Sequence, residues 1–320
     1  VILVGDLFDL LDVAKGRVRI DPYLPFLGRP EDLVVKRLFL AADAVGVIIE
    51  RELVLQTLAR CDGNRTRAAR VLATLHGRPV GYADLRAALA QHAGLPQGHA
   101  LILGNGSDEL ISLVSLACAL PPSADGQRPV VLAPVPGFVM YAMSAQLQGL
   151  DFVGVPLTPD FELDEAAMLA AIAQHRPAIT HLAYPNNPTA TLWNEDVVQR
   201  IIDAVAAVGG IVVMDEAYQP FASRTWLDRM RAEPQRNAHV LLMRTLSKFG
   251  LAGVRIGYLM APAAFAAQIE KLRPPFNVSV LNTEAALFAL EHAGEFTRQA
   301  SLIQSERGRL MAALATPTDC

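Results

Sequence analysis

One lysine and one aspartate lie where their side chains could serve the same reaction. Lys248 is on a glycine-bearing loop between two apolar runs, residues 240–243 and 256–260. Asp215 directly follows a third apolar run, residues 210–214. A loop amine can condense with an aldehyde, and a strand-end carboxylate can keep a pyridine nitrogen protonated. These are the two groups that pyridoxal phosphate chemistry requires of a protein.

The sequence also contains a candidate anion site. Residues 104–110 (GNGSDEL) combine two glycines with the start of a predicted helix, and the first N–H groups of a helix have no partner within it. Ser247 and Arg255 flank Lys248 and could hold a phosphate by charge-assisted hydrogen bonds. The alternative is an ordinary capped helix start.

Three further side chains lie near predicted strand ends. Asn187, in the segment 184–189 (YPNNPT), is typical of a turn, but its amide could instead donate to the phenolic oxygen of the cofactor. Tyr218 lies three residues after Asp215 and could reach the same oxygen. Phe138 would ordinarily pack in the core, and the functional interpretation is a flat surface under the cofactor ring.

Composition sets broad limits on function. The chain has 320 residues, 52% of them hydrophobic, a mean hydropathy of +0.29, a net charge of −4 and a pI near 6.0. This is ample for a packed core, and neither charge nor pI gives a global reason to bind nucleic acid or a membrane.

Cysteine usage and the chain ends bear on location. Cys61, Cys118 and Cys320 are widely spaced and odd in number, with no disulfide framework or zinc spacing, which favours a reducing cytoplasm and no metal site. Residues 1–11 lack the basic start of a signal peptide, and no uninterrupted apolar run of 18 residues is present. Because the sequence begins without Met and stops abruptly, we expect a truncated chain.

From residue 76 onward, short apolar runs alternate with amphipathic segments. The predicted strands are 130–133, 151–155, 179–184, 211–214, 240–243 and 256–260. The predicted helices are 108–120, 138–148, 164–175, 195–208, 263–272, 281–292 and 295–315. This order predicts an α/β fold with three αβα layers around a mostly parallel sheet, with functional loops at the carboxyl ends of the strands.

Residues 1–75 differ from the rest. The segment 50–72 resembles the first two helices of a Fis-type helix-turn-helix, but Gly77 and Pro79 stand where a recognition helix should continue. An ordinary basic helical hairpin is the favoured interpretation, and we expect no specific binding of nucleic acid. We predict a helical segment of uncertain origin over 1–75, a cofactor-binding large domain over 76–275, and the start of an incomplete small domain over 276–320.

Five ordered motifs together resemble the fold-type I pyridoxal phosphate aminotransferases, and most of all their histidinol-phosphate branch. They are the segments 104–110, 136–141, 185–189, 215–218 and 244–258. The segment 273–279 (RPPFNVS) favours the same branch. The resemblance covers about three quarters of the chain.

The resemblance implies a role for each matching residue. Lys248 would form the covalent link to the cofactor, Asp215 would pair with the pyridine nitrogen, and Asn187 and Tyr218 would contact the phenolic oxygen. Phe138 would stack on the ring. The remaining positions would hold the phosphate, namely the N–H groups of Ser107 and Asp108 and the side chains of Ser247 and Arg255. The family also implies a cytoplasmic homodimer with a shared active site.

The sequence departs from the family pattern at several positions. Asp21-Pro22-Tyr23 only loosely matches the family's N-terminal motif, and Gly77-Arg78-Pro79 lacks the expected tyrosine, with Tyr82 at a different position. Ala190 replaces an expected glycine. The chain stops before the family's substrate-binding arginine. We therefore expect cofactor binding to survive better than turnover.

The predicted activity is amino transfer between L-histidinol phosphate and 2-oxoglutarate, as part of histidine biosynthesis. An aromatic amino acid aminotransferase or a phosphothreonine-type decarboxylase of the same fold remains an alternative. So does a catalytically impaired fragment, or a DNA-binding regulator built on an aminotransferase-like body.

Overall fold

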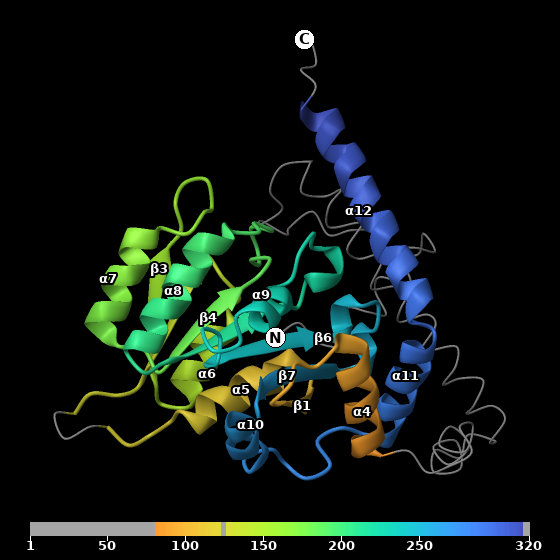
Figure 1. Cartoon of the computed structure of the whole chain (residues 1–320), viewed down its shortest axis with the longest axis horizontal. Helices are drawn as coiled ribbons and strands as arrows, with labels where there is room; N and C mark the ends of the chain where they lie inside the picture. The colour runs from red at the N-terminus through yellow and green to blue at the C-terminus, as the bar shows by residue number, and fades with distance from the viewer. Residues whose placement is uncertain (1–80, 123–125, 316–320) are drawn as a thin grey trace, which may run out of the picture. The chain divides into compact units, whose positions relative to one another are not determined.

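A seven-stranded sheet forms the centre of the computed structural model, which describes residues 81–122 and 126–315 (Figure 1). Across the sheet the strands lie in the order β1-β7-β6-β5-β4-β2-β3, and among them β7 alone runs antiparallel to its neighbours. In chain order they are β1 (His99–Asn105), β2 (Val130–Val135), β3 (Asp151–Pro156), β4 (Ile179–Ala183), β5 (Ile211–Asp215), β6 (Val240–Thr245) and β7 (Ile256–Pro262).

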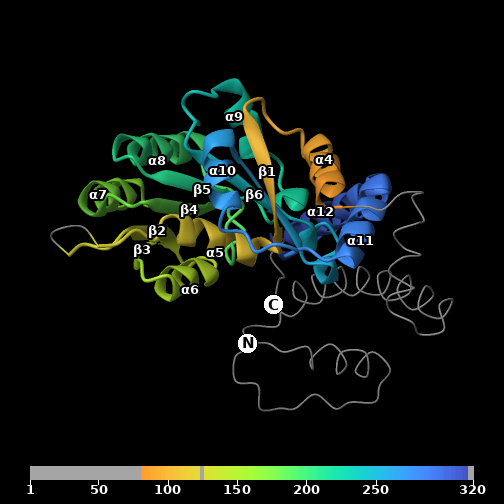
Figure 2. The same cartoon turned by 90° about the horizontal axis from the view of Figure 1, so that it is seen from below.

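Helices cover both faces of this sheet. The α-helices are α4 (Tyr82–Ala93), α5 (Ser107–Ala117), α6 (Met140–Leu147), α7 (Glu165–His175), α8 (Glu195–Ala207), α9 (Trp226–Ala232), α10 (Ala263–Glu270), α11 (Val280–Glu291) and α12 (Ala293–Ala315). Helices α5, α6 and α10 pack into one core, while α4, α7, α8, α9 and α11 pack into the other. Figure 2 shows α6 and α8 on opposite sides of the sheet.

Hydrophobic periodicity explains this layering. Every residue of β5 and of β6 is buried, as expected for strands covered on both faces. Helix α8 buries Val198, Ile201, Ile202 and Val205, which recur at helical spacing. Burial of each of these side chains stabilises the fold by about 1.5–3 kcal/mol. The Asn194 side chain caps this helix by accepting from the N–H groups of residues 196 and 197.

The predicted strands are confirmed, with ends that differ by at most two residues. The predicted helices are also present, although the one expected over 108–120 ends at Ala117 and the one expected from residue 138 begins at Met140. Strand β1 and helices α4 and α9 were not predicted. Two short 3₁₀ turns were also not predicted: η2 (Leu246–Lys248), which contains Ser247 and Lys248, and η3 (Ala252–Val254), which directly precedes Arg255.

The three-layer αβα fold is therefore confirmed for the described residues. Helix α11 packs against α4, and its Ala286 and Ala289 join the core of the sheet. The proposed division at residues 75 and 275 stays a prediction, and both the helix-turn-helix-like segment and Tyr23 lie outside the described residues. Of the helices described, none is long and apolar enough to cross a membrane.

Candidate active site

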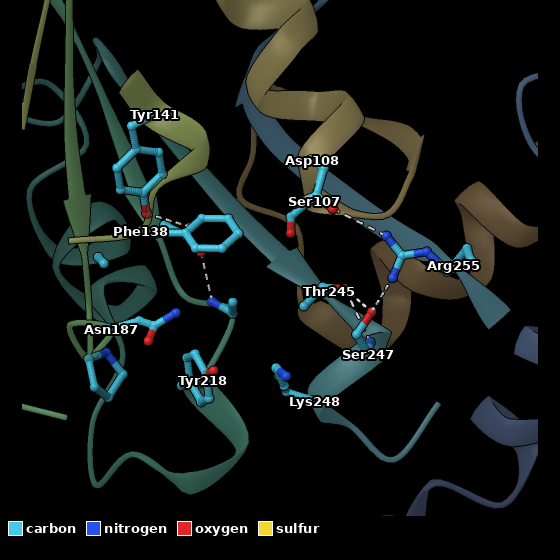
Figure 3. Close-up of a pocket in the computed structure, with 14 residues that line it drawn as sticks. Ser107, Asp108, Phe138, Tyr141, Asn187, Tyr218, Thr245, Ser247, Lys248 and Arg255 are labelled. Carbon is cyan, nitrogen blue, oxygen red and sulfur yellow. Dashed lines mark hydrogen bonds and ion pairs between the residues drawn. The ribbon is translucent and has the colours of Figure 1, made fainter. Parts of the chain in front are cut away.

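A cavity of ≈ 170 Å³ lies at the carboxyl ends of the parallel strands, beside the N-terminus of α5 (Figure 3). This is the edge where loops from a parallel sheet converge. The nine residues selected from the sequence all line it: Ser107, Asp108, Phe138, Asn187, Asp215, Tyr218, Ser247, Lys248 and Arg255. Five others that were not selected also line it: Tyr141, Ala183, Pro185, Ala217 and Thr245.

The start of α5 forms one wall. Gly106 precedes the helix with φ +79°, a conformation that favours glycine, and a Cβ there would lie 2.4 Å from Nη2 of Arg255. Gly257 of β7 has the same need for space, because its Cβ would lie 2.6 Å from the carbonyl carbon of Gly106. The two glycines thus let β7 and Arg255 approach the helix N-terminus closely.

Arg255 links this wall to the lysine loop. Its Nη2 lies 3.3 Å from Oδ2 of Asp108, and its Nη1 donates to Oγ of Ser247 at 3.4 Å. The hydroxyl of Thr245 accepts from the N–H of Ser247 at 3.1 Å and thereby caps η2. A guanidinium, a hydroxyl and the free N–H groups of a helix start therefore surround one point, which suits an anion.

Asp215 is almost fully buried at the end of β5. Its Oδ2 accepts from the hydroxyl of Tyr141 at 2.7 Å, and its Oδ1 accepts from the N–H of Ala217 at 2.9 Å. The pKa of Asp215 is raised to about 6: burial and the charges of Asp108 and Glu216 raise it, burial most of all, while both hydrogen bonds lower it. Such a carboxylate favours a cationic partner within the cavity.

Tyr141 is a functional candidate that the sequence reasoning missed. It comes from α6, and its ring stacks on the ring of His181 from β4, with centroids 4.3 Å apart and an interplanar angle of 4°. Phe138 meets the same tyrosine ring edge to face, at 5.7 Å and 85°. The available signal was only that Tyr141 lies three residues after Phe138 in the same motif.

Lys248 ends η2 and points into the cavity (Figure 3). Its Nζ lies 5.3 Å from the ring centroid of Tyr218. Figure 3 also shows Asn187 near Tyr218, on the side of the cavity away from Arg255. The amine, the phenol and the amide therefore face the same space.

Asn186 holds the two loops that carry Phe138 and Asn187. Its Nδ2 donates to the carbonyl of Pro136 at 3.2 Å and to the hydroxyl of Thr189 at 2.9 Å. Its side chain is buried, so these bonds replace water and fix the loops together.

A buried ion pair lies directly behind the site. Oε2 of Glu216 accepts from Nη2 of Arg244 at 2.8 Å and from its Nε at 3.0 Å, while Thr225 donates to the same carboxylate at 2.8 Å. Because Glu216 follows β5 and Arg244 belongs to β6, the pair ties together the strand ends that present Asp215 and Lys248.

The structure describes two positions, 190 and 82, at which the sequence departs from the family pattern. Ala190 adopts φ +59°, a left-handed conformation in which glycine is usual. Tyr82 does not line the cavity: its hydroxyl accepts from the N–H of Leu103 at 3.1 Å, and its ring lies 4.3 Å from the guanidinium carbon of Arg273.

Comparison with known proteins identifies the family. The model for aminotransferase class I and II matches residues 57–320, which is most of the chain. The chain belongs to this family. The resemblance inferred from the five motifs is thereby confirmed at the level of the family.

Individual aminotransferases add detail. The chain is 74% identical over 231 residues to the histidinol-phosphate aminotransferase of Paracidovorax citrulli (strain AAC00-1), covering 72% of this chain but 62% of that relative. The first curated relatives are similarly matched over about three fifths of their length.

Two solved aminotransferases share the fold. The histidinol-phosphate aminotransferase of Sinorhizobium meliloti, determined in complex with pyridoxal-5'-phosphate, is 27% identical with a TM-score of 0.60 over 71% of this chain and 60% of that one. The enzyme from Clostridium acetobutylicum, at 22% identity, gives a TM-score of 0.63 over 73% and 66%. The described sheet and its helices therefore correspond to the large domain of the fold-type I aminotransferases.

Proposed function

We propose that this chain carries the pyridoxal phosphate site of an enzyme that transfers an amino group between L-histidinol phosphate and 2-oxoglutarate. The supporting observation is the convergence of Lys248, Asp215 and an anion-binding helix start on one cavity. The named activity of the relatives at 63–75% identity supports the choice of substrate pair. The chain spans about three fifths of the length of those relatives.

The residues present fit this cofactor at both of its ends. A buried carboxylate with a raised pKa suits a pyridinium nitrogen, which assigns that contact to Asp215. The cluster of Ser107, Asp108, Ser247 and Arg255 suits a phosphate, with the two helix N–H groups as donors. An incoming phosphate would compete with the Asp108 carboxylate for the guanidinium of Arg255.

The middle of the cavity suits the ring. Phe138 would pack against one face, while Asn187 and Tyr218 would bind the phenolic oxygen. When bound, pyridoxal phosphate supplies an aldehyde that condenses with amines and a ring that accepts electrons. The protein supplies binding, orientation and proton transfer around it.

Each catalytic residue has a defined task. Asp215 would hold a proton on the ring nitrogen, which would keep the ring electron-accepting. Lys248 would hold the cofactor through its aldehyde, and its free Nζ would be the base that moves the proton from the substrate Cα. Tyr218 lies beside that amine, with 5.3 Å from Nζ to its ring centroid.

The setting of the enzyme follows from the same resemblance. We propose a homodimer that acts in the cytoplasm on small-molecule substrates, without specific binding of nucleic acid. Sedimentation of the purified protein, with and without the cofactor, tests the dimer.

The function is tested by a half-reaction. Purified protein is loaded with pyridoxal phosphate, reduced with borohydride, and digested to map the modified lysine. Loaded, unreduced protein is then mixed with L-histidinol phosphate, an aromatic amino acid or phosphothreonine, and the loss of the cofactor's aldehyde absorbance is followed. We expect modification at Lys248 and the fastest reaction with L-histidinol phosphate. A faster reaction with another donor, or release of CO2 from phosphothreonine, would contradict the proposal.

A further inference from the structure

Three side chains from different elements form a chain of contacts that begins at His181, outside the cavity lining, and ends on Asp215. His181 of β4 stacks in parallel on Tyr141 of α6, and the Tyr141 hydroxyl donates to Oδ2 of Asp215 at 2.7 Å. All three residues are buried. The tyrosine and histidine have no part in the mechanism above.

His181 is unusual because its ring is fully buried and neither ring nitrogen has a hydrogen-bond partner within the described structure. Burial lowers the pKa of His181 to about 3, so the ring is neutral at physiological pH. An unpaired polar ring in an apolar strand is costly compared with an aliphatic side chain. What the imidazole provides instead is a flat face, 4.3 Å from the tyrosine ring and nearly parallel to it.

The stack leaves the Tyr141 hydroxyl fully available to Asp215. Neither nitrogen of His181 binds the hydroxyl, and the parallel contact fixes the plane of the tyrosine ring. Among the described residues, Tyr141 is the side-chain donor to this carboxylate, and the second donor is the N–H of Ala217. A donor to an ionised carboxylate stabilises its charge.

The charged groups near Asp215 act in the opposite direction. Asp108 at the start of α5 and Glu216, the next residue in the chain, both disfavour a second negative charge. Burial disfavours it most of all. Removal of the tyrosine hydroxyl would therefore leave the carboxylate with one backbone donor against three unfavourable influences.

We propose that Tyr141 is a positioning residue that keeps Asp215 ionised and oriented for the cofactor's ring nitrogen, and that His181 holds the tyrosine ring in the orientation this requires. The effect on the cofactor rests on the proposed function, whereas the effect on Asp215 itself does not. The two can therefore be tested separately.

The first experiment uses the protein without cofactor and compares Tyr141→Phe with Tyr184→Phe. Tyr184 is a matched control because it is also buried and its hydroxyl does not bind Asp215: the hydroxyl accepts from Nε of Arg224 at 2.7 Å, and only the backbone N–H of Tyr184, which the substitution keeps, donates to the backbone carbonyl of Asp215. Urea unfolding midpoints are measured from pH 4 to 9. Asp215 is protonated more readily when folded, so its contribution to stability falls as pH rises through its folded pKa.

We expect this fall, which ends near pH 6 in the unmodified protein, to extend to higher pH in Tyr141→Phe and to end at the same pH in Tyr184→Phe. The Asp215→Asn protein should show no such fall, and adding Tyr141→Phe to it should cause no further pH-dependent change. A Tyr141→Phe curve parallel to that of the unmodified protein would overturn the proposal. If Tyr141→Phe does not fold, biosynthetic 3-fluorotyrosine provides a stronger donor, and the fall should move to lower pH.

The role of His181 is tested with a pair of substitutions. His181→Phe keeps a flat ring against Tyr141, and His181→Leu removes it. Neither variant contains the histidine, so the two are compared with each other from pH 4 to 9, and in the phenylalanine variant we expect the fall of Asp215 to end near pH 6. The leucine variant should shift toward Tyr141→Phe, and equal curves for the two variants would overturn the role of the stack.

The second experiment measures cofactor affinity at pH 7. Tyr141→Phe should weaken pyridoxal phosphate binding about tenfold, the size expected for one lost hydrogen bond to a charged group, and Tyr184→Phe less than about twofold. An analogue with carbon in place of the ring nitrogen should bind both variants about equally. Equal weakening for both ligands would make Tyr141 a structural residue only. If neither the unmodified protein nor its two variants bind the cofactor, the proposed function is wrong. The unfolding curves still decide the role of Tyr141 in that case.

Discussion

Nζ of Lys248 lies 5.3 Å from the ring centroid of Tyr218, and the two side chains reach this contact from the ends of neighbouring strands, β6 and β5. No ion pair to Lys248 occurs within residues 81–122 and 126–315. A cation–π contact of this kind is worth about 0.5–1 kcal/mol, so the amine can leave it at little cost. The lysine is thus held near the centre of the cavity without being fixed to a carboxylate.

Replacing this amine should abolish the covalent link to the cofactor. In Lys248→Ala, we expect no borohydride-trapped adduct, while pyridoxal phosphate still binds non-covalently through the phosphate and ring contacts. Mass spectrometry of digested protein checks this, with Lys271→Ala as the control that should keep the adduct. An adduct found at Lys36 or Lys271 would show that the assignment is wrong.

Asp215→Asn should affect both turnover and the pH dependence of stability. Loss of the charge that keeps the ring nitrogen protonated should raise the activation barrier of the reaction by several kcal/mol, on the order expected for preorganised charges.

The second effect is on stability. Because the folded pKa of Asp215 is raised to about 6, this residue stabilises the fold in acid, and its contribution is lost as pH rises from about 4 to about 6. The difference in unfolding free energy between Asp215→Asn and the unmodified protein should therefore grow by about 3 kcal/mol over that window and then stay constant. Unchanged turnover would rule out the electron-sink role, and a flat difference would rule out the raised pKa.

His181 has the opposite pH dependence. Its folded pKa is lowered to about 3, so the unfolded chain binds a proton more readily and stability is lost as pH falls below about 6.5. His181→Phe should remove this loss and become more stable than the unmodified protein by about 3 kcal/mol at pH 4, relative to their difference at pH 8. Urea unfolding at the two pH values measures it. An unchanged difference would mean that His181 is not buried as a neutral ring.

Much of the site could be predicted because its residues lie at the ends of strongly apolar strands. Asp215 and Lys248 each follow such a strand, and parallel strands bring their carboxyl ends to one edge of the sheet. Strand β1 was missed because it contains only a short apolar run, 100–103, at the edge of the sheet. Helix α9 was missed because its seven residues include three charges and little periodicity.

The contacts behind the cavity could not be predicted, because they depend on how separate elements pack. Tyr141 and Asp215 are 74 residues apart, and they meet only because α6 packs on the face of the sheet where His181 also points. The pairing of Glu216 with Arg244 likewise depends on β5 and β6 being neighbours. Neither pair has a sequence spacing that signals a contact.

Ala190 offers a test of backbone strain. At φ +59°, an alanine costs roughly 1–2 kcal/mol that a glycine does not, although glycine costs about 0.4–1 kcal/mol more to order. We expect Ala190→Gly to stabilise the protein slightly, by about 0.5 kcal/mol. Ala222→Gly is the matched control: Ala222 has φ −84°, so only the cost of ordering applies and stability should fall. Equal destabilisation by both changes in urea unfolding would show that the left-handed conformation at Ala190 carries no strain.

The phosphate contacts are tested through Arg255, whose guanidinium bridges Asp108 and Ser247. Arg255→Ala should weaken pyridoxal phosphate binding by about 1.5–3 kcal/mol, the range for hydrogen bonds to a charged group. Pyridoxal without its phosphate should lose little affinity. Arg200→Ala is the control: it breaks an exposed ion pair with Glu165, outside the cavity, and should affect the binding of neither ligand.

Asp108→Asn removes a carboxylate that competes with the phosphate for Arg255. We therefore expect this variant to bind pyridoxal phosphate more tightly, with the helix N–H groups kept in place. Titration of all three variants with both ligands measures these effects. Equal weakening of pyridoxal and its phosphate by Arg255→Ala would mean that the arginine supports the loop rather than the anion, and weaker binding in Asp108→Asn would place the carboxylate on the side of the cofactor.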